Sequence, residues 1–312
     1  MVLFFITISF SQYREWEDLS VFKINTEQPH SFFIPYDKAG DSLTQTLNGT
    51  WDFKLYKIDD DIPKEFYKKS YNKSDWDKIP VPSNWQFHTE DFPVYTNIIY
   101  PYEINPPFMP SDYNPVALYK RNFDFNKDWE NMEVFIHFGA VNSAFYVWVN
   151  EKFVGYSEGS KTPAEFNLTD FLIDGNNEIV LKVIRWSDGT YLEDQDFWRL
   201  SGIERDVFLY AQPKLAVRDY FLKNYLNDDL TNSKINFEVD LKNYSNKGKD
   251  YQLITSIKKD NKVVFKKTKN GMIGSNDSQK ILIDGEVTYP QLWSAEIPNL
   301  YDVEIEIQDS DN

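Results

Sequence analysis

The chain has 312 residues, a formal net charge of −16 and 17% aromatic residues, with nine Trp, 20 Tyr and 24 Phe. This length predicts about two domains, and the aromatic content excludes a disordered chain, because such chains lack large apolar side chains. The negative charge excludes binding to nucleic-acid phosphates, the absence of Cys excludes disulfides and thiol nucleophiles, and three His without metal-site spacing argue against a His-based metalloenzyme.

The N-terminal residues Met1–Phe10 are almost wholly apolar and give way to the polar pair Ser11 and Gln12. Residues 1–12 have two interpretations, a truncated signal peptide or an apolar N-terminal strand. The first implies export to the periplasm or the extracellular space, and the second leaves a cytoplasmic protein. The run has no basic flank and is far shorter than the roughly 20 residues that a membrane span needs, so we expect no membrane span.

The middle of the chain contains short segments rich in β-branched and aromatic residues, which predict strands. These segments are Glu133–Phe138, Ala144–Val149, Lys152–Tyr156 and Glu178–Ile184. Turns are predicted at residues 150–152 and 174–177, where Asn, Asp and Gly interrupt the apolar pattern. Residues 63–71 form the best candidate for a short helix. Several short strands without alternating helices favour a sandwich or jelly roll.

A second unit is predicted from about residue 213, because Pro213 follows the strand that ends at Tyr210. Ile235, Phe237, Val239 and Leu241 alternate with polar residues, and Tyr301–Ile307 repeats this pattern, so each segment has one face in a core. Further strands are expected at residues 251–257, 263–267 and 279–283, giving an antiparallel sandwich of the immunoglobulin type. Asp309–Asn312 is interpreted as a hairpin turn whose return strand would follow, which suggests a gene fragment.

Several sequence stretches are more specific than strand propensity alone requires. In chain order they read VPSNWQ at 81–86, PVYTN at 93–97, NPPF at 105–108, NSAF at 142–145, VGY at 154–156, TPAEF at 162–166, RWSDG at 185–189, YLEDQD at 191–196, WRLSGI at 198–203 and LWSAEIPNLY at 292–301. Together they resemble the β-galactosidases of glycoside hydrolase family 2. The resemblance extends from about Trp16 to the end of the chain.

The resemblance implies an all-β fold in two parts. Residues 13–212 would form a sugar-binding jelly roll of the galactose-binding type, and residues 213–312 a C-terminally incomplete immunoglobulin-like β-sandwich. The TIM barrel that carries catalysis in this family is absent from the chain. We therefore expect the barrel to be a partner of these residues, with a β-galactoside as substrate. Formation of a homo-oligomer by the full-length enzyme stays open.

An acidic loop carries Asp188, Glu193, Asp194 and Asp196 within nine residues. Its ordinary interpretation is a solvated acidic surface, and its functional interpretation is a site for a cation or for sugar hydroxyls. The family resemblance favours the second and implies that Asn97 and Asp196 reach into the barrel active site. It also implies that Asp196 binds sodium. The alternative for Asn97 is a residue that only forms a turn.

Some members of the family also hold magnesium in the jelly roll. The matching positions here are Glu15, Asp18, the Val21 carbonyl, Glu158 and Asp188. Glu15, Asp18 and Glu158 differ from the side chains expected at these positions, although each still offers oxygen ligands. The resemblance thus implies Na⁺ and Mg²⁺ as cofactors.

Catalysis by a retaining glycosidase needs two carboxyl groups about 5–5.5 Å apart. The family takes both from its barrel, so no residue of this chain is expected to be catalytic, and Glu193 and Asp196 are assigned to support. Three alternatives stay open. They are a non-catalytic carbohydrate-binding module, another family 2 hydrolase such as a β-glucuronidase or β-mannosidase, and a structural or interaction protein. A reading frame that continues with barrel strands would favour the enzyme.

Overall fold

The computed structural model describes residues 14–193 and 195–309, so the predicted signal segment and Asp194 lie outside the described residues. The chain forms two compact units. The first contains the described residues up to Glu27, Thr44–Asp128 and Val134–Tyr210, and the second contains Gln28–Leu43, Trp129–Glu133 and the described residues from Ala211 onward. The division into residues 13–212 and 213–312 stays a prediction.

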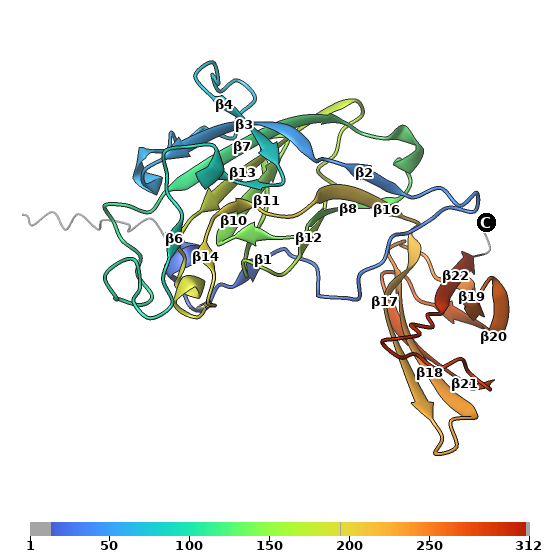
Figure 1. The fold of residues 1–312 in the computed structure, drawn as a ribbon. Helices are drawn as coiled ribbons and strands as arrows, with labels where there is room; N and C mark the ends of the chain where they lie inside the picture. Colours follow the sequence, from blue (N-terminus) through green and yellow to red (C-terminus); the bar gives the residue numbers. More distant parts are fainter. Residues whose placement is uncertain (1–13, 194, 310–312) are drawn as a thin grey trace, which may run out of the picture. The chain divides into compact units, whose positions relative to one another are not determined.

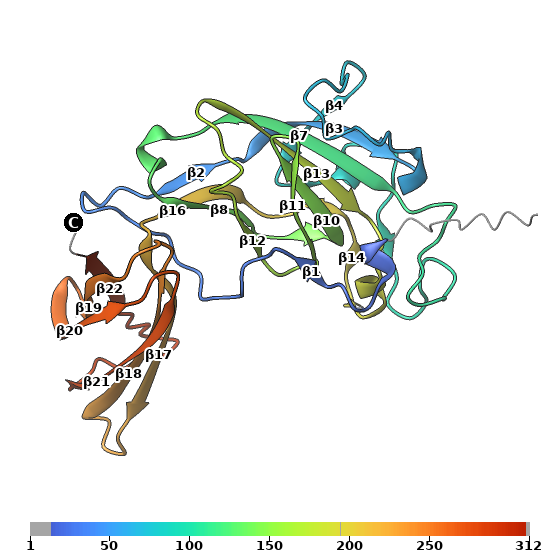
Figure 2. The same ribbon diagram turned by 180° about the vertical axis from the view of Figure 1, so that it is seen from behind.

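The first unit is a sandwich of two antiparallel sheets (Figures 1 and 2). The larger sheet has the order β1 (Lys23–Ile24), β11 (Lys152–Glu158), β10 (Ala144–Val149), β13 (Asn176–Ile184), β7 (Val116–Asp124), β3 (Gly49–Tyr56) and β4 (Asp77–Val81). The smaller sheet has the order β12 (Ala164–Asn167), β8 (Glu133–Phe138), β16 (Val207–Gln212) and β2 (Thr44–Thr46).

Aromatic side chains fill the space between these two sheets. Phe138 from β8 meets Phe145 from β10 edge to face, with ring centroids 5.1 Å apart, and Phe166 from β12 packs on both rings. β8 is buried along its whole length, and β10 is buried except at Trp148, which is half-buried. Both strands are therefore covered on both of their faces.

Short elements connect the strands at the rim of the first unit. Two-residue strands form the ribbon β6 (Val94–Tyr95) with β14 (Trp198–Arg199), and the small sheet β5 (Ser83–Asn84), β15 (Gly202–Ile203) and β9 (Val141–Asn142). The 3₁₀ turns are η1 (Glu15–Glu17), η2 (Asp59–Asp61), η3 (Trp85–Phe87), η4 (Lys127–Trp129) and η5 (Asp188–Tyr191). The predicted hairpin turn at residue 150 is confirmed, since Asn150 and Glu151 both have positive φ.

The helix predicted at residues 63–71 was wrong. The segment forms successive turns, closed by bonds such as that from the Phe66 amide to the Pro63 carbonyl (3.1 Å). Phe66 and Tyr67 both pack on Trp148, with ring centroids 5.0 and 5.8 Å away. These two ring contacts hold the turns against β10.

The second unit is also a two-sheet sandwich, of the immunoglobulin-like type. One sheet has the order β17 (Leu215–Leu226), β18 (Asn232–Asn243) and β21 (Ser278–Thr288), and the other β20 (Lys262–Ile273), β19 (Lys249–Lys259) and β22 (Asp302–Asp309). Phe237 from β18 stacks on Phe265 from β20, which joins the two sheets in one core. Gly285 faces the Phe265 ring so closely that a Cβ atom there would clash with it.

The predicted alternation in β18 is confirmed, because Ile235, Phe237, Val239 and Leu241 are all buried while their neighbours are more exposed. Asp309, the first residue of the predicted C-terminal turn, is the last residue of β22, where it lies opposite Tyr251 and forms a 2.5 Å ion pair with Lys249. The other residues of that predicted turn, 310–312, lie outside the described residues.

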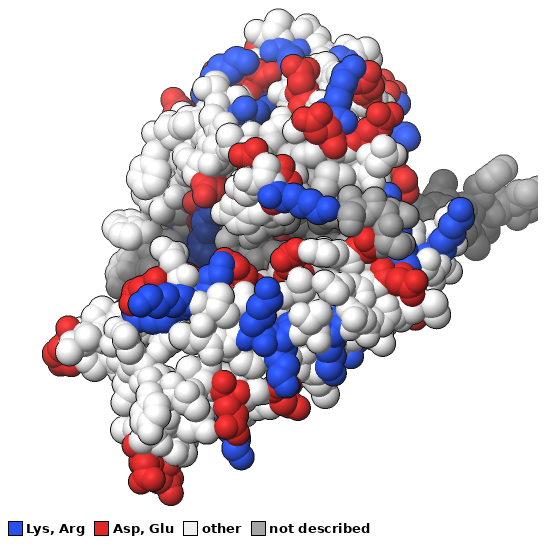
Figure 3. Space-filling model, turned by 90° about the vertical axis from the view of Figure 1, so that its right-hand side faces the viewer, with Lys and Arg blue, Asp and Glu red and all other residues white. Residues whose placement is uncertain are grey.

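The described residues contain strands and 3₁₀ turns but no α-helix, which confirms the all-β fold class. Within this part of the chain, no helix has the length and apolar character that a membrane crossing requires. Figure 3 shows Lys and Arg side chains interspersed with Asp and Glu on the face that it presents.

Candidate functional site

The β6–β14 ribbon brings together two loops that are far apart in the sequence (Figure 1). Tyr95 lies opposite Trp198 in the ribbon, and their rings are 5.5 Å apart. Both rings are more than half exposed. The Tyr95 hydroxyl donates a 2.5 Å hydrogen bond to Asp196, and this bond raises the pKa of Tyr95. An exposed aromatic pair beside a carboxylate can pack on the apolar face of a sugar and accept from its hydroxyls.

Asn97 lies on the exposed turn that follows β6. The turn is closed by Thr96, whose hydroxyl donates a 2.5 Å hydrogen bond to the Ile99 carbonyl. The side-chain bond that closes the turn therefore comes from Thr96 and not from Asn97. The amide of Asn97 can both donate to and accept from hydroxyls of a ligand.

Arg199, the second residue of β14, connects the two loops. Its buried guanidinium donates from Nε to the Thr96 carbonyl (3.3 Å) and from Nη1 to the Glu193 carbonyl (3.2 Å). The Glu193 carboxylate in turn accepts from the Ser160 amide (2.9 Å) and from the Ser160 hydroxyl. Glu193 thus anchors its loop, which agrees with its assignment to support.

A buried ion pair fixes the start of the first loop. Asp91 is paired with Arg185, and both side chains are 1% exposed. Asp91 also accepts hydrogen bonds from Trp85 Nε1 (2.6 Å), Gln86 Nε2 (2.9 Å) and the Tyr113 hydroxyl (2.7 Å). Arg185 donates to the Phe92 carbonyl (2.9 Å), so the pair holds the backbone three residues before Tyr95. These bonds offset the cost of burying both charges.

Sequence reasoning missed this pair and the bridging role of Arg199. Asp91 falls in the gap between two of the quoted motifs, and its partner Arg185 is 94 residues away. No local periodicity links positions at that separation. The one available signal was Arg185 itself, because a charged residue that directly follows the buried strand β13 requires a partner.

A second group of predicted residues lies at η5. Glu158 and Asp188 are both buried, and each affects the pKa of the other. Burial raises the pKa of Glu158 to about 8 and also raises that of Asp188. Oδ2 of Asp188 has no hydrogen-bond partner among the described residues. A cation would satisfy this oxygen and would favour the ionised form of both groups.

The remaining predicted magnesium ligands lie in and after η1. Glu15 accepts a hydrogen bond from the Tyr146 hydroxyl, and Asp18 accepts from the Ser20 amide (2.9 Å) and hydroxyl (2.7 Å). The charge of Asp18 contributes to the raised pKa of Asp188, and half-buried Val21 follows on the same segment. Among residues 14–193 and 195–309, no group of three or more Asp, Glu or His side chains is arranged to hold a metal ion.

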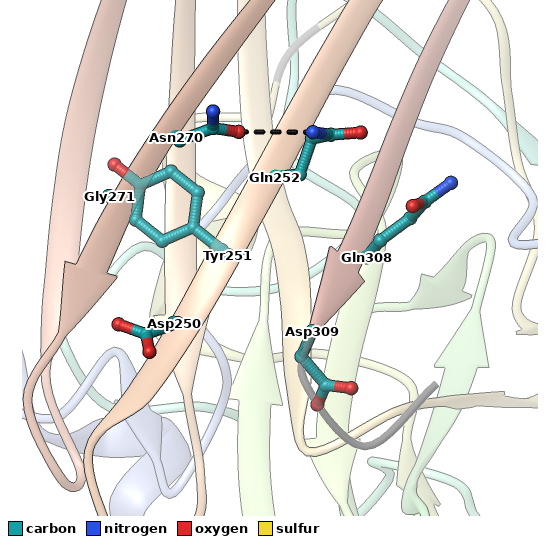
Figure 4. A pocket seen from close by; sticks show the side chains of 7 residues that line it. All are labelled: Asp250, Tyr251, Gln252, Asn270, Gly271, Gln308 and Asp309. Carbon is teal, nitrogen blue, oxygen red and sulfur yellow. Dashed lines mark hydrogen bonds between the residues drawn. The ribbon is translucent and has the colours of Figure 1, made fainter.

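A shallow hollow of about 600 Å³ lies on the second unit (Figure 4). It is lined by Asp250, Tyr251, Gln252, Asn270, Gly271, Gln308 and Asp309. Gln252 donates a 3.2 Å hydrogen bond to Asn270, which links the side chains of two neighbouring strands. None of the predicted site residues lines it.

Two family models match the chain. Residues 44–213 match the sugar binding domain of "Glycosyl hydrolases family 2", and residues 215–312 match a second model of "Glycosyl hydrolases family 2". A curated β-galactosidase from Priestia megaterium is 36% identical over 98% of this chain, and one from Oenococcus oeni is 38% identical over 96%. The chain spans only 31% and 29% of the length of these relatives.

Solved structures share the fold at lower identity. A calcium-binding mutant of β-glucuronidase 2 from Bacteroides uniformis aligns with a TM-score of 0.71 and 22% identity, covering 86% of this chain and 31% of its own. A putative β-galactosidase from Bacteroides fragilis aligns with a TM-score of 0.69 and 19% identity, covering 86% and 39%. At these identities the likeness concerns the fold alone.

Proposed function

The chain belongs to glycosyl hydrolase family 2, and we propose that it is the N-terminal part of a β-galactosidase that removes terminal β-D-galactose by a retaining mechanism. The observation that carries this proposal is the match to two curated β-galactosidases at 36% and 38% identity over nearly the whole chain. The loops at the β6–β14 ribbon would contribute substrate contacts to an active site in a barrel beyond these residues.

The hydrogen bonds and the burial of the carboxylates in the described residues indicate which of them could take part in catalysis. Glu193 accepts from the Ser160 amide and anchors its loop, whereas Asp196, which accepts from Tyr95, would bind sugar hydroxyls or a cation without taking part in bond cleavage. The Glu158–Asp188 pair is buried, so a glycoside cannot reach it. The acid/base and nucleophilic carboxylates of a retaining enzyme flank the scissile bond and must contact substrate. We therefore place both outside this chain.

Asn97 and Asp196 are the proposed substrate contacts. Both are exposed and lie on the two loops that the ribbon joins, where the rings of Tyr95 and Trp198 are also exposed. An amide and a carboxylate next to aromatic rings can bind the hydroxyls of galactose while its apolar face packs on a ring. This combination supports a sugar as the ligand.

Asp196 would also hold sodium, since carboxylate oxygens are suitable ligands for hard cations. A bound sodium ion would supply positive charge beside the sugar hydroxyls. At η5, Glu158 and Asp188 fit a magnesium ion best, because Asp188 leaves a buried oxygen without a partner. Glu15, Asp18 and Val21 would complete that site only with further ligands such as water.

The experiment that tests the proposal is a comparison of nitrophenyl glycosides as substrates of the full-length protein. We expect hydrolysis of the β-D-galactoside and far slower hydrolysis of the β-D-glucuronide and β-D-mannoside. Faster hydrolysis of either of the other two would move the protein to another activity of the family. Binding of galactosides without hydrolysis of any of the three would indicate a carbohydrate-binding module.

A further inference from the structure

The guanidinium of Arg199 joins the two proposed substrate loops. Arg199 is 8% exposed and donates to one backbone carbonyl in each loop, that of Thr96 at 3.3 Å and that of Glu193 at 3.2 Å. Both of these acceptors are main-chain oxygens, so the two bonds tie Arg199 to the backbones of both loops.

Each carbonyl is close in sequence to a proposed substrate contact. Thr96 directly precedes Asn97, and Glu193 precedes Asp196 by three residues. The Glu193 end is itself anchored, because its carboxylate binds the amide and the hydroxyl of Ser160. The guanidinium therefore links the turn that carries Asn97 to the anchored loop of Glu193.

We propose that Arg199 is a positioning residue that sets the spacing between Asn97 and Asp196. This inference rests on the proposed function of those two residues. The planar guanidinium presents several donors in a rigid fork, whereas a lysine ammonium is a compact charge that cannot reproduce this geometry. Arg199→Lys keeps the positive charge but removes the planar guanidinium. Arg199→Met keeps much of the apolar stem and removes both the charge and the guanidinium.

The first test measures amide hydrogen exchange in the 312-residue chain without ligand. We expect Arg199→Met to speed exchange at Glu193, Phe197 and Trp198 about tenfold, since a hydrogen bond from a charged donor is lost. Arg199→Lys should have a smaller effect. Amides of β13 should keep their rates, which shows that the core of the first unit stays folded.

The matched control is Arg121→Met. Arg121 also donates to a backbone carbonyl, that of Asn48 at 3.0 Å, but lies on β7. We expect no change at Glu193, Phe197 or Trp198 in this variant. Unchanged exchange at these amides in Arg199→Met, or the same loss in Arg121→Met, would overturn the bridging role.

The second test is a mutant cycle on the activity of the full-length enzyme. Arg199→Met should lower kcat/KM for a β-galactoside about tenfold when Asn97 and Asp196 are present, and less than about twofold when both are replaced, because coupled residues are not additive. If Arg199→Met still lowered kcat/KM tenfold after Asn97 and Asp196 were replaced, Arg199 would not act through these two residues. If the full-length protein hydrolyses no β-galactoside, the proposed function fails, while the exchange result still decides whether Arg199 joins the loops.

Discussion

The Tyr95 hydroxyl donates a 2.5 Å hydrogen bond to Oδ1 of Asp196, across 101 residues of sequence. This bond and the pairing of Tyr95 with Trp198 place the loop of Asn97 beside the loop of Asp196. The arrangement therefore depends on contacts between the loops as well as on the sandwich below them.

Replacing Tyr95 with Phe removes this hydrogen bond while keeping the ring that packs on Trp198. We expect a loss of about 2–10-fold in kcat/KM of the full-length enzyme, corresponding to about 0.5–1.5 kcal/mol for one hydrogen bond. Tyr289→Phe is the control, because Tyr289 is exposed and lies in the second unit. Equal kcat/KM of Tyr95→Phe and the unmodified enzyme would show that Tyr95 does not contribute to the site.

Because the Asp196 bond raises the pKa of Tyr95, Asp196→Asn should lower that pKa in an NMR titration of labelled tyrosine.

The sodium hypothesis for Asp196 and the acidic-surface alternative predict opposite results. If Asp196 binds sodium, activity of the full-length enzyme should rise with sodium concentration, and Asp196→Asn should weaken both this response and the affinity for galactose. An amide supplies a ligand oxygen without the charge that balances the cation. If the loop is only an acidic surface, removing one charge should be neutral or slightly stabilising. Identical sodium curves at equal activity would exclude the cation role.

The raised pKa of Glu158 predicts how stability depends on pH. Burial favours the neutral form, so the folded-state pKa of about 8 lies above the ordinary value of 4.5. The stability contributed by the proton is fully present below about pH 4.5 and is lost as the pH rises through about 8. In the presence of a chelator, the melting temperature of the chain should therefore fall between pH 5 and 9, and Glu158→Gln should flatten this fall.

The control for this prediction is Glu130→Gln, which removes an exposed carboxylate and should keep the unmodified slope. Parallel curves for Glu158→Gln and the unmodified chain would contradict the assignment. Magnesium at pH 8 should raise the melting temperature, because binding to the folded state stabilises it. Asp188→Asn should reduce this increase.

The buried pair Asp91–Arg185 predicts a large effect on stability. Asp91→Asn leaves the Arg185 charge buried without a counterion, which should cost about 3–5 kcal/mol in urea denaturation of the first unit. The surface pair Lys127–Asp174 is the matched control, with both side chains more than 70% exposed. Asp174→Asn should change stability by less than about 1 kcal/mol. Similar losses of stability in Asp91→Asn and Asp174→Asn would show that the buried Asp91–Arg185 pair contributes no more to stability than an exposed pair.

Much of the fold could be predicted because its strands are long enough to show a period. β8 and β10 have the predicted bounds, and the alternation in β18 places the correct face in the core. The segment at residues 63–71 was misjudged because tertiary packing on Trp148 decided its conformation. Local propensity carries no information about such a partner.

The site could be predicted only in part. Motifs led to the proposal of Asn97 and Asp196, but β6 and β14 have two residues each, and two residues are too short to show a period. The ribbon, the bridge by Arg199 and the Asp91–Arg185 pair join residues about 90 to 100 positions apart. Contacts of this kind follow from the folded arrangement of the sheets and not from any local pattern.

The central claim is that these 312 residues supply substrate contacts while the catalytic carboxylates lie elsewhere. Turnover of nitrophenyl β-D-galactoside by the purified 312-residue chain, measured beside the full-length protein, tests it most directly. We expect hydrolysis by the full-length protein and none by the 312-residue chain. Turnover by the 312-residue chain that is abolished by a substitution within it would contradict the claim.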